Sequence, residues 1–139
     1  MKRIWKYIYK KVRNYPLSSL LTAAIWVACL VPVPETPLKD VSFFDKWVHI
    51  GMYALLVLVI WHEYVHRYEK QASLKKLLLW GWLAPALMGG VIELAQAWCT
   101  GGNRSGDWLD FAADAFGATV GALIGILLVA IRARGRRDS

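Results

Sequence analysis

Three groups of polar and ionisable side chains lie within or directly beside strongly apolar segments of the sequence. They are Asp45, Lys46 and His49, then Glu93 and Gln96, then Arg104, Asp107, Asp110 and Asp114. A buried carboxyl group with a raised pKa can exchange protons with an imidazole as a general acid or base. Carboxylates with one imidazole can also hold a divalent cation, and Arg or Lys can bind a phosphate or carboxylate group. These residue types therefore indicate acid–base chemistry, cation binding or anion binding.

The spacing of these side chains places each group on one face of a helix. Apart from Lys46, which directly follows Asp45, successive members lie three or four residues apart, which is the spacing of neighbours on a helix surface. The sets that share a face are Asp45, His49 and Tyr53, then Glu93 and Gln96, then Asp107, Asp110 and Asp114. Because an ionisable side chain that faces lipid is costly, we expect all three faces to point inward and to form one shared polar pocket.

Different members of this predicted pocket suit different roles. The candidate catalytic residues are His49, Glu93 and Asp110. The candidate substrate-binding residues are Lys46, Tyr53, Gln96, Arg104, Asp107 and Asp114. Structural roles stay open beside these: His49 as a packing histidine, and Asp45 and Asp107 as helix N-caps, a position where Asp is common. Since no serine or cysteine stands in a nucleophile constellation, whether the chain is an enzyme also stays open.

The elements that must position these residues are predicted from the apolar segments. The chain has 139 residues, 57% of them hydrophobic and eight of them Trp, which is too apolar for a typical soluble domain. Apolar segments cover residues 16–32, 47–61, 77–98 and 108–131. A helix needs about 20 residues to cross the hydrocarbon core. We therefore predict an all-α fold, an integral membrane bundle of four transmembrane helices joined by short loops.

The distribution of basic residues predicts the orientation of this bundle. Of the 17 Lys and Arg residues, all but Lys39, Lys46 and Arg104 lie before the first segment, between the second and third, or after the fourth. Basic flanks of this kind face the cytoplasm, so both termini are predicted to be cytoplasmic and the polar pocket to open outward. The net charge of +7 is then explained by topology, and no nucleic-acid partner is expected.

The same analysis divides the chain into three parts and gives its glycines a packing role. Residues 1–15 form a basic and aromatic interfacial segment, residues 16–131 the transmembrane domain, and residues 132–139 a basic cytoplasmic tail. Gly117, Gly121 and Gly125 recur at every fourth position below the last acids. Such a stripe lets another helix approach closely, either within the chain or in a homo-oligomer.

A family resemblance adds to this interpretation. The segments "DKWVHIGMY", "GGVIELAQ" and "RSGDWLDFAADAFGATVG" resemble the VanZ-like family, and the resemblance covers roughly residues 45–125. One departure is Asp114, where the family usually has Asn. The resemblance implies a bacterial inner-membrane protein whose namesake is associated with low-level teicoplanin resistance. It leaves the family's chemistry open.

Two hypotheses about function follow from the pocket. In the first, it binds or acts on a lipid-linked envelope substrate, such as a cell-wall precursor, or a glycopeptide, with membrane lipids as its surroundings. A divalent cation held by the carboxylates and His49 belongs to this hypothesis. In the second, the polar residues form a buried stabilising network in a non-catalytic structural or interaction protein. An ion pathway is weaker, because the inner halves of the segments carry Leu, Ala and Gly.

Overall fold

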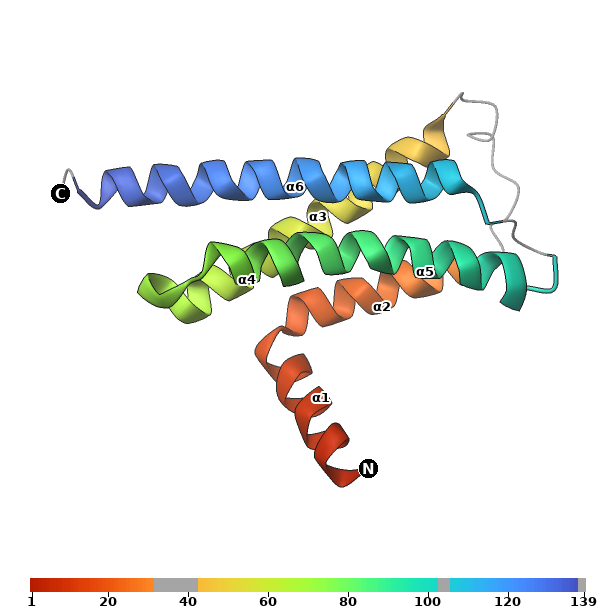
Figure 1. The fold of residues 1–139 in the computed structure, drawn as a ribbon, viewed down its shortest axis with the longest axis horizontal. Coiled ribbons are helices and arrows are strands. Elements are labelled where there is room, and N and C mark those ends of the chain that lie inside the picture. The colour runs from red at the N-terminus through yellow and green to blue at the C-terminus, as the bar shows by residue number, and fades with distance from the viewer. Residues whose placement is uncertain (32–42, 103–105, 138–139) are drawn as a thin grey trace.

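The computed structural model describes residues 1–31, 43–102 and 106–137, and this part of the chain is helical without any strand. The prediction of an all-α fold is therefore confirmed. In chain order the elements are α1 (Lys2–Asn14), α2 (Pro16–Leu30), α3 (Phe44–Tyr68), η2 (Glu69–Gln71), α4 (Leu74–Leu78), η3 (Leu79–Leu83), α5 (Ala84–Cys99) and α6 (Trp108–Gly135). Figure 1 shows α2, α3, the α4–α5 unit and α6 running side by side, with α1 turned away from them.

Three of these units are long and apolar enough to cross a membrane. They are Phe44–Tyr68, Leu74–Cys99 and Trp108–Gly135, and about a third of each is buried inside the bundle. The apolar helix α2 has only 15 residues, which corresponds to about 22 Å at 1.5 Å per residue. That is shorter than a hydrocarbon core of about 30 Å. The four segments predicted from the sequence thus become three long helices and one shorter one in the described residues.

The predicted second segment ended too early. We placed its end near residue 61, whereas α3 continues to Tyr68. Its last two turns have polar residues on one side, such as the exposed His62 and His66, while Tyr64 and Val65 pack against a buried cluster. The length of an apolar run in the sequence does not predict such a helix end, because the helix becomes amphipathic there and apolar residues alternate with polar ones.

The third long unit contains a turn of π-helix, η3, between α4 and α5. Pro85 has no backbone N–H, so the carbonyl of Gly81 cannot accept the usual hydrogen bond from it. The Trp61 indole N–H donates to this carbonyl instead, at 3.3 Å. A side chain at Gly81 would meet the Trp61 ring at 2.7 Å, so glycine permits this contact. The wide turn and its proline thus fix where α3 crosses the third unit.

The helices α3 and α6 form the closest pair, and the glycine stripe of α6 makes this possible. A Cβ at Gly117 would lie 2.8 Å from the Ile50 Cα, and a Cβ at Gly121 would lie 2.6 Å from the Ala54 carbonyl oxygen. The stripe therefore lies against α3 of the same chain. Close backbone approach of this kind stabilises helix pairs in a membrane through van der Waals contact.

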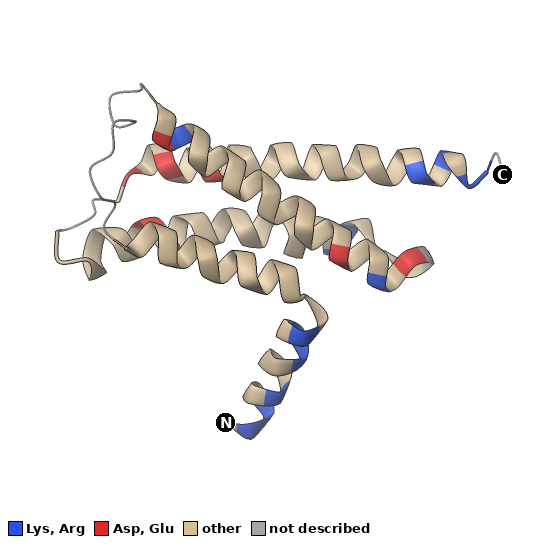
Figure 2. Cartoon of the chain, turned by 180° about the vertical axis from the view of Figure 1, so that it is seen from behind, with Lys and Arg blue, Asp and Glu red and all other residues tan. Residues whose placement is uncertain are grey.

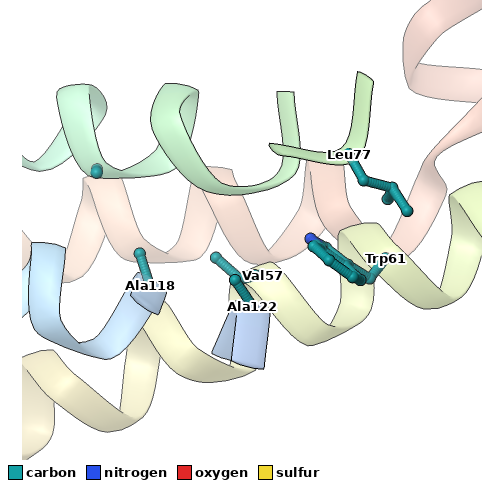
Figure 3. Packing of buried hydrophobic residues seen from close by; sticks show 6 residues of the cluster. Val57, Trp61, Leu77, Ala118 and Ala122 are labelled. Atoms are coloured by element: carbon teal, nitrogen blue, oxygen red, sulfur yellow. The ribbon is translucent and has the colours of Figure 1, made fainter. Parts of the chain in front are cut away.

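Two apolar clusters fill the bundle. Figure 3 shows part of the first, in which Trp61 lies between Leu77 on one side and Val57 and Ala122 on the other, with Ala118 further away. The second joins α2, α3 and α5 and consists of Ile25, Cys29, Tyr53, Leu56 and Ile92. Within the described residues, Cys29 and the exposed Cys99 are not joined by a disulfide, and Cys29 belongs to this packing cluster. Most other large apolar side chains remain exposed, as a lipid-facing surface requires.

Charged residues divide the bundle into two ends. Figure 2 shows acidic residues gathered where α3 and α6 begin, and most basic residues at the opposite end and along α1. We call the first the acidic end; it contains Asp45, Asp107, Asp110, Asp114 and Glu93. We call the second the basic end; it contains the starts of α2 and α4 and the ends of α3 and α6.

Candidate functional site

The acidic end holds a cluster of seven ionisable side chains from three helices, which we call the carboxylate–histidine cluster. Its members are Asp45, Lys46 and His49 of α3, Glu93 of α5, and Asp107, Asp110 and Asp114 at the start of α6. Four of them are buried: His49, Glu93, Asp110 and Asp114. Buried ionisable groups are rare in spanning helices and mark functional sites more often than other buried residues do.

Lys46 is the cation at the margin of the cluster. Its Nζ lies 2.8 Å from Oδ2 of Asp107 and also donates to Oδ1 of Asp110. Oδ2 of Asp45 lies 3.5 Å away. The Lys46 ammonium group is thus paired with carboxylates of the protein itself. The substrate-binding role that the sequence predicts for Lys46 stays a prediction.

His49 occupies the centre of the cluster, on the inward face of α3. Its Nδ1 lies 2.8 Å from Oδ1 of Asp114, within hydrogen-bond distance. Its Nε2 faces two further carboxylates, Asp45 Oδ1 and Asp110 Oδ2, each at 4.0 Å. A carboxylate on one imidazole nitrogen fixes the orientation of the ring and leaves the other nitrogen for a ligand or a proton.

Glu93 joins α5 to the start of α6. Its Oε2 accepts a hydrogen bond from the backbone N–H of Asp107 at 2.7 Å. A Cβ at Gly106 would clash with the Glu93 carbonyl. Only a glycine at this position lets the backbone lie so close to α5. On the other side, a Cβ at Gly89 would lie 2.6 Å from Oδ2 of Asp114. These two glycines let α5 and α6 bring their carboxylates into one cluster.

Among the residues that the structure describes, two carboxylate oxygens deep in this cluster find no hydrogen-bond partner. They are Oε1 of Glu93 and Oδ2 of Asp114, and their residues are 7% and 1% exposed. The described cluster contains five carboxyl groups, one ammonium and one imidazole, so acids outnumber cations even when the imidazole is protonated. An unpaired buried acceptor is costly, and a cation, a proton or a nearby donor would satisfy these oxygens. The buried Tyr53 hydroxyl, which also lacks a partner among the described residues, is such a donor near Asp114.

The geometry permits a metal ion at two overlapping places. One is formed by Asp45, His49 and Asp110, and the other by His49, Glu93 and Asp114; in each, one ligand atom per residue lies within 4.8 Å of the others. The three residues of the second place are all buried, and they include the two residues that carry the unpaired oxygens. Carboxylates with one imidazole suit several divalent ions.

The two aspartates predicted as possible N-caps behave differently. Asp107 is the N-cap of α6, and its Oδ1 accepts from the backbone N–H of Leu109 at 2.9 Å. The hydrogen bond from Lys46 lowers the pKa of the Asp107 carboxyl below its ordinary value, with the Leu109 N–H contributing. Asp45 is not a cap, because α3 begins after Phe43 and Asp45 lies in the first turn. Its carboxylate instead points toward Lys46 and His49.

Other predicted site residues have different surroundings. Gln96 is buried, and its amide N–H donates to the carbonyl of Cys29 at 2.7 Å, which satisfies a backbone group near the end of α2. Tyr53 is fully buried in the apolar cluster one turn further along α3 from His49. Arg104 lies outside the described residues. Tyr53 thus lies deeper in the bundle than the cluster, while Gln96 has a structural bond at the end of α2.

Three residues near or opposite the site were missed from the sequence. Gly89 and Gly106 were not predicted to contact acids, because a glycine gives no signal of what its missing side chain makes room for. Glu63 was missed because we ended the second segment near residue 61. At the basic end, the Glu63 carboxylate accepts from the backbone N–H groups of Leu17 and Ser18, at 2.9 and 3.1 Å. An acid so close after an apolar run was a usable signal, because a helix N-terminus attracts a carboxylate.

Comparison with known proteins gives no assignment: no protein-family model, no curated protein and no solved structure matches this chain. The resemblance to the VanZ-like family therefore depends on the three quoted segments alone. What the cluster does must be argued from its geometry.

Proposed function

We propose that this chain is a VanZ-like bacterial inner-membrane protein that binds a lipid-linked envelope substrate at the carboxylate–histidine cluster, with a divalent cation between protein and substrate. The observation that supports this most is the pair of buried carboxylate oxygens without a partner, Oε1 of Glu93 and Oδ2 of Asp114. They lie in a cluster where acids outnumber cations.

The topology belongs to the proposal. Four spanning helices with both termini in the cytoplasm place the basic end inside and the acidic end outside, in agreement with the tendency of Lys and Arg to remain cytoplasmic. The three long apolar helices support a membrane location, and the proposal takes the shorter apolar helix α2 as the fourth span. An outward-facing acidic end would meet the head groups of lipid-linked envelope precursors.

The cation follows from the charges in the site. A phosphate or carboxylate of the substrate would be repelled by five carboxyl groups, because Lys46 is already paired with Asp107 and Asp110. A divalent ion held by His49, Glu93 and Asp114 reverses the local sign and would bind such an anion. His49 and Glu93 are also the groups placed to move a proton if the bound substrate reacts.

Cation binding is the first test. The full chain in nanodiscs is titrated with Mn²⁺ and followed by electron paramagnetic resonance, with the parent compared with Glu93→Gln and His49→Gln. We expect saturable binding to the parent and at least tenfold weaker binding to both variants, since each loses a ligand atom. Glu63→Gln is the matched control, because it changes an acid of the same bundle at the opposite end. Equal Mn²⁺ affinity in parent and site variants, or no saturable binding to the parent, would contradict the proposed cation.

The biological side of the proposal needs a separate measurement. Parent and variants are expressed in a bacterial host at matched membrane levels, and susceptibility to teicoplanin is compared. We expect Glu93→Gln and His49→Gln to lose any protection that the parent gives, while Glu63→Gln keeps it. Protection that survives both site substitutions would separate the resistance phenotype from this site.

A buried stabilising network is the alternative, and a specific observation favours it: Lys46 bridges acids of α6 from α3, and His49 is bonded to Asp114. In that case each site substitution would lower the thermal unfolding temperature strongly. The proposed binding function instead predicts retained stability with lost cation binding.

A further inference from the structure

The basic end contains a cavity that has no part in the proposed cation site. Its volume is about 540 Å³, and it lies where α1, α2, α3 and the α4–η3 segment meet. Lys11 and Lys76 line it from two different helices. In the described part of the chain, neither lysine forms a salt bridge. The cavity therefore presents two positive charges without a carboxylate partner.

The polar part of the wall consists mainly of tyrosines. Tyr7, Tyr15, Tyr64 and Tyr68 all line the cavity. The ammonium group of Lys11 lies 5.5 Å from the ring centre of Tyr7 and 5.9 Å from that of Tyr15, which orders the lysine by cation–π contact. Phenolic hydroxyl groups can donate hydrogen bonds to a phosphate oxygen. Burial raises the pKa of Tyr15 to about 12, so its hydroxyl keeps its proton at neutral pH.

One acid beside this wall, Glu63, already has hydrogen-bond partners. The Glu63 carboxylate is held by the first turn of α2, where it accepts from the Leu17 and Ser18 backbone and from the Ser18 hydroxyl. Its charge is thus directed at the helix N-terminus behind the wall. The two lysines remain for a ligand, and the Tyr64 hydroxyl, which accepts from the Ser73 N–H at 3.2 Å, still has its own proton to donate.

The rest of the wall is apolar. Ile60, Leu77 and Trp80 line the cavity, and Trp80 is 65% exposed on the outside of the bundle. Trp80 belongs to the π-helical turn η3, and π-turns occur often at binding sites. A free phosphate ion would form no favourable contact with such an apolar margin. A phospholipid would, because its acyl chains lie beside its head group. The helix α1 adds further exposed lysines and aromatic residues close to the cavity.

From the two unpaired lysines, the tyrosine hydroxyls and the apolar margin of one cavity, we propose that the basic end binds the phosphate head group of an anionic phospholipid. Lys11 and Lys76 contact the phosphate, and the acyl chains lie along Trp80 and Leu77. Basic pockets between spanning helices are suited to such head groups. This inference does not depend on the cation site, and it holds for whichever leaflet contacts the basic end.

Native mass spectrometry of the full chain, purified in detergent and supplied with dioleoyl phosphatidylglycerol, tests the proposal. The site variant is Lys11→Gln with Lys76→Gln. The matched control is Lys10→Gln with Lys75→Gln, which removes the same charge from neighbouring exposed lysines that do not line the cavity. We expect the site variant to retain at least fivefold less bound phosphatidylglycerol than the parent and the control to retain as much as the parent. A third variant, Lys11→Arg with Lys76→Arg, should keep the lipid, and its thermal unfolding reports on folding.

Several results would overturn this proposal. Equal losses in the site variant and the control would indicate general attraction of a basic surface to anionic lipid. Retention of dioleoyl phosphatidylcholine by the parent at the same level would remove the role of the negative head group. Displacement of the lipid by equimolar inorganic phosphate would show a free-phosphate site in which acyl chains contribute nothing.

Discussion

The two ends of this bundle each contain a buried or half-buried glutamate, and the two are used in opposite ways. At the basic end, both oxygens of Glu63 accept hydrogen bonds from the first turn of α2. At the acidic end, Glu93 has one oxygen bonded to the Asp107 N–H and the other unpaired among further carboxylates. A satisfied carboxylate stabilises a fold, whereas an unsatisfied one costs stability and is ready for a ligand. We infer that Glu63 is structural and that Glu93 belongs to a binding site.

The substitution with the largest expected effect disturbs the contact between α3 and α6, the two helices that connect the acidic end to the basic end. Gly117→Leu places a side chain against the Ile50 backbone, which cannot move without separating α3 from α6. Overpacking of this kind costs about 1–3 kcal/mol and occasionally more, and we expect the upper part of that range because the obstacle is backbone. Thermal unfolding in nanodiscs measures the loss. Gly51→Leu on α3 is the control, since a Cβ there meets nothing within 4 Å. Similar unfolding temperatures for the two variants would mean that α3 and α6 are not packed as described.

The next effect tests the comparison of the two glutamates directly. Glu63→Gln loses a charge that accepts three hydrogen bonds at the start of α2, so we expect it to lower the free energy of unfolding by about 1–3 kcal/mol. Glu93→Gln keeps an oxygen for the Asp107 N–H and removes a charge from a crowded cluster. We expect it to change stability by less than about 1 kcal/mol, or to raise it. If Glu93→Gln is the more damaging of the two in denaturant unfolding, the acidic cluster is a stabilising network.

Sequence reasoning predicted the fold better than the details of the site, for physical reasons that particular residues show. Apolar length and helical spacing are local properties, so α6 was predicted at 108–131 and extends over Trp108–Gly135. The inward face of α3 could also be predicted from local sequence, because the four-residue spacing of His49 and Tyr53 places both side chains on one face. Both are buried. What Lys46 bonds to depends on the rotation of α6 against α3, and no spacing within one helix determines it. The same holds for Gly89, whose role appears only when Asp114 is placed beside it.

A third prediction concerns a residue that blurs the comparison. Gln96 lies at the acidic end, and we predicted it to bind substrate, yet its amide supports the end of α2 through the Cys29 carbonyl. Gln96→Leu removes one hydrogen bond to a buried carbonyl, which should cost about 1 kcal/mol. Mn²⁺ affinity should stay at the parent value. A variant with normal unfolding temperature and weakened Mn²⁺ binding would instead place Gln96 in the site.

The smallest effect is a pH dependence at the acidic end. Lys46 lowers the pKa of Asp107, so the folded state binds a proton less readily than the unfolded chain does. The resulting stability is fully present above the ordinary Asp pKa of about 3.9 and is lost as the pH falls through the lower folded value. Since the Asp107 side chain is 37% exposed, we expect a contribution below about 1 kcal/mol. Asp107→Asn keeps an N-cap oxygen for the Leu109 N–H and removes only the charge.

This last prediction is checked by the difference in unfolding free energy between parent and Asp107→Asn, measured from pH 7 to pH 2. The parent should be slightly more stable above about pH 5, and the difference should shrink below about pH 4 as Asp107 takes up its proton. Lys46→Met should weaken the same dependence, because the hydrogen bond that lowers the pKa most is gone and the contribution of the Leu109 N–H remains. A pH dependence that is undiminished in Lys46→Met would show that Lys46 has no part in setting this pKa. Lys46 would then bind its acids too weakly to keep it from an anionic substrate, and the argument for an intervening cation would lose its electrostatic basis.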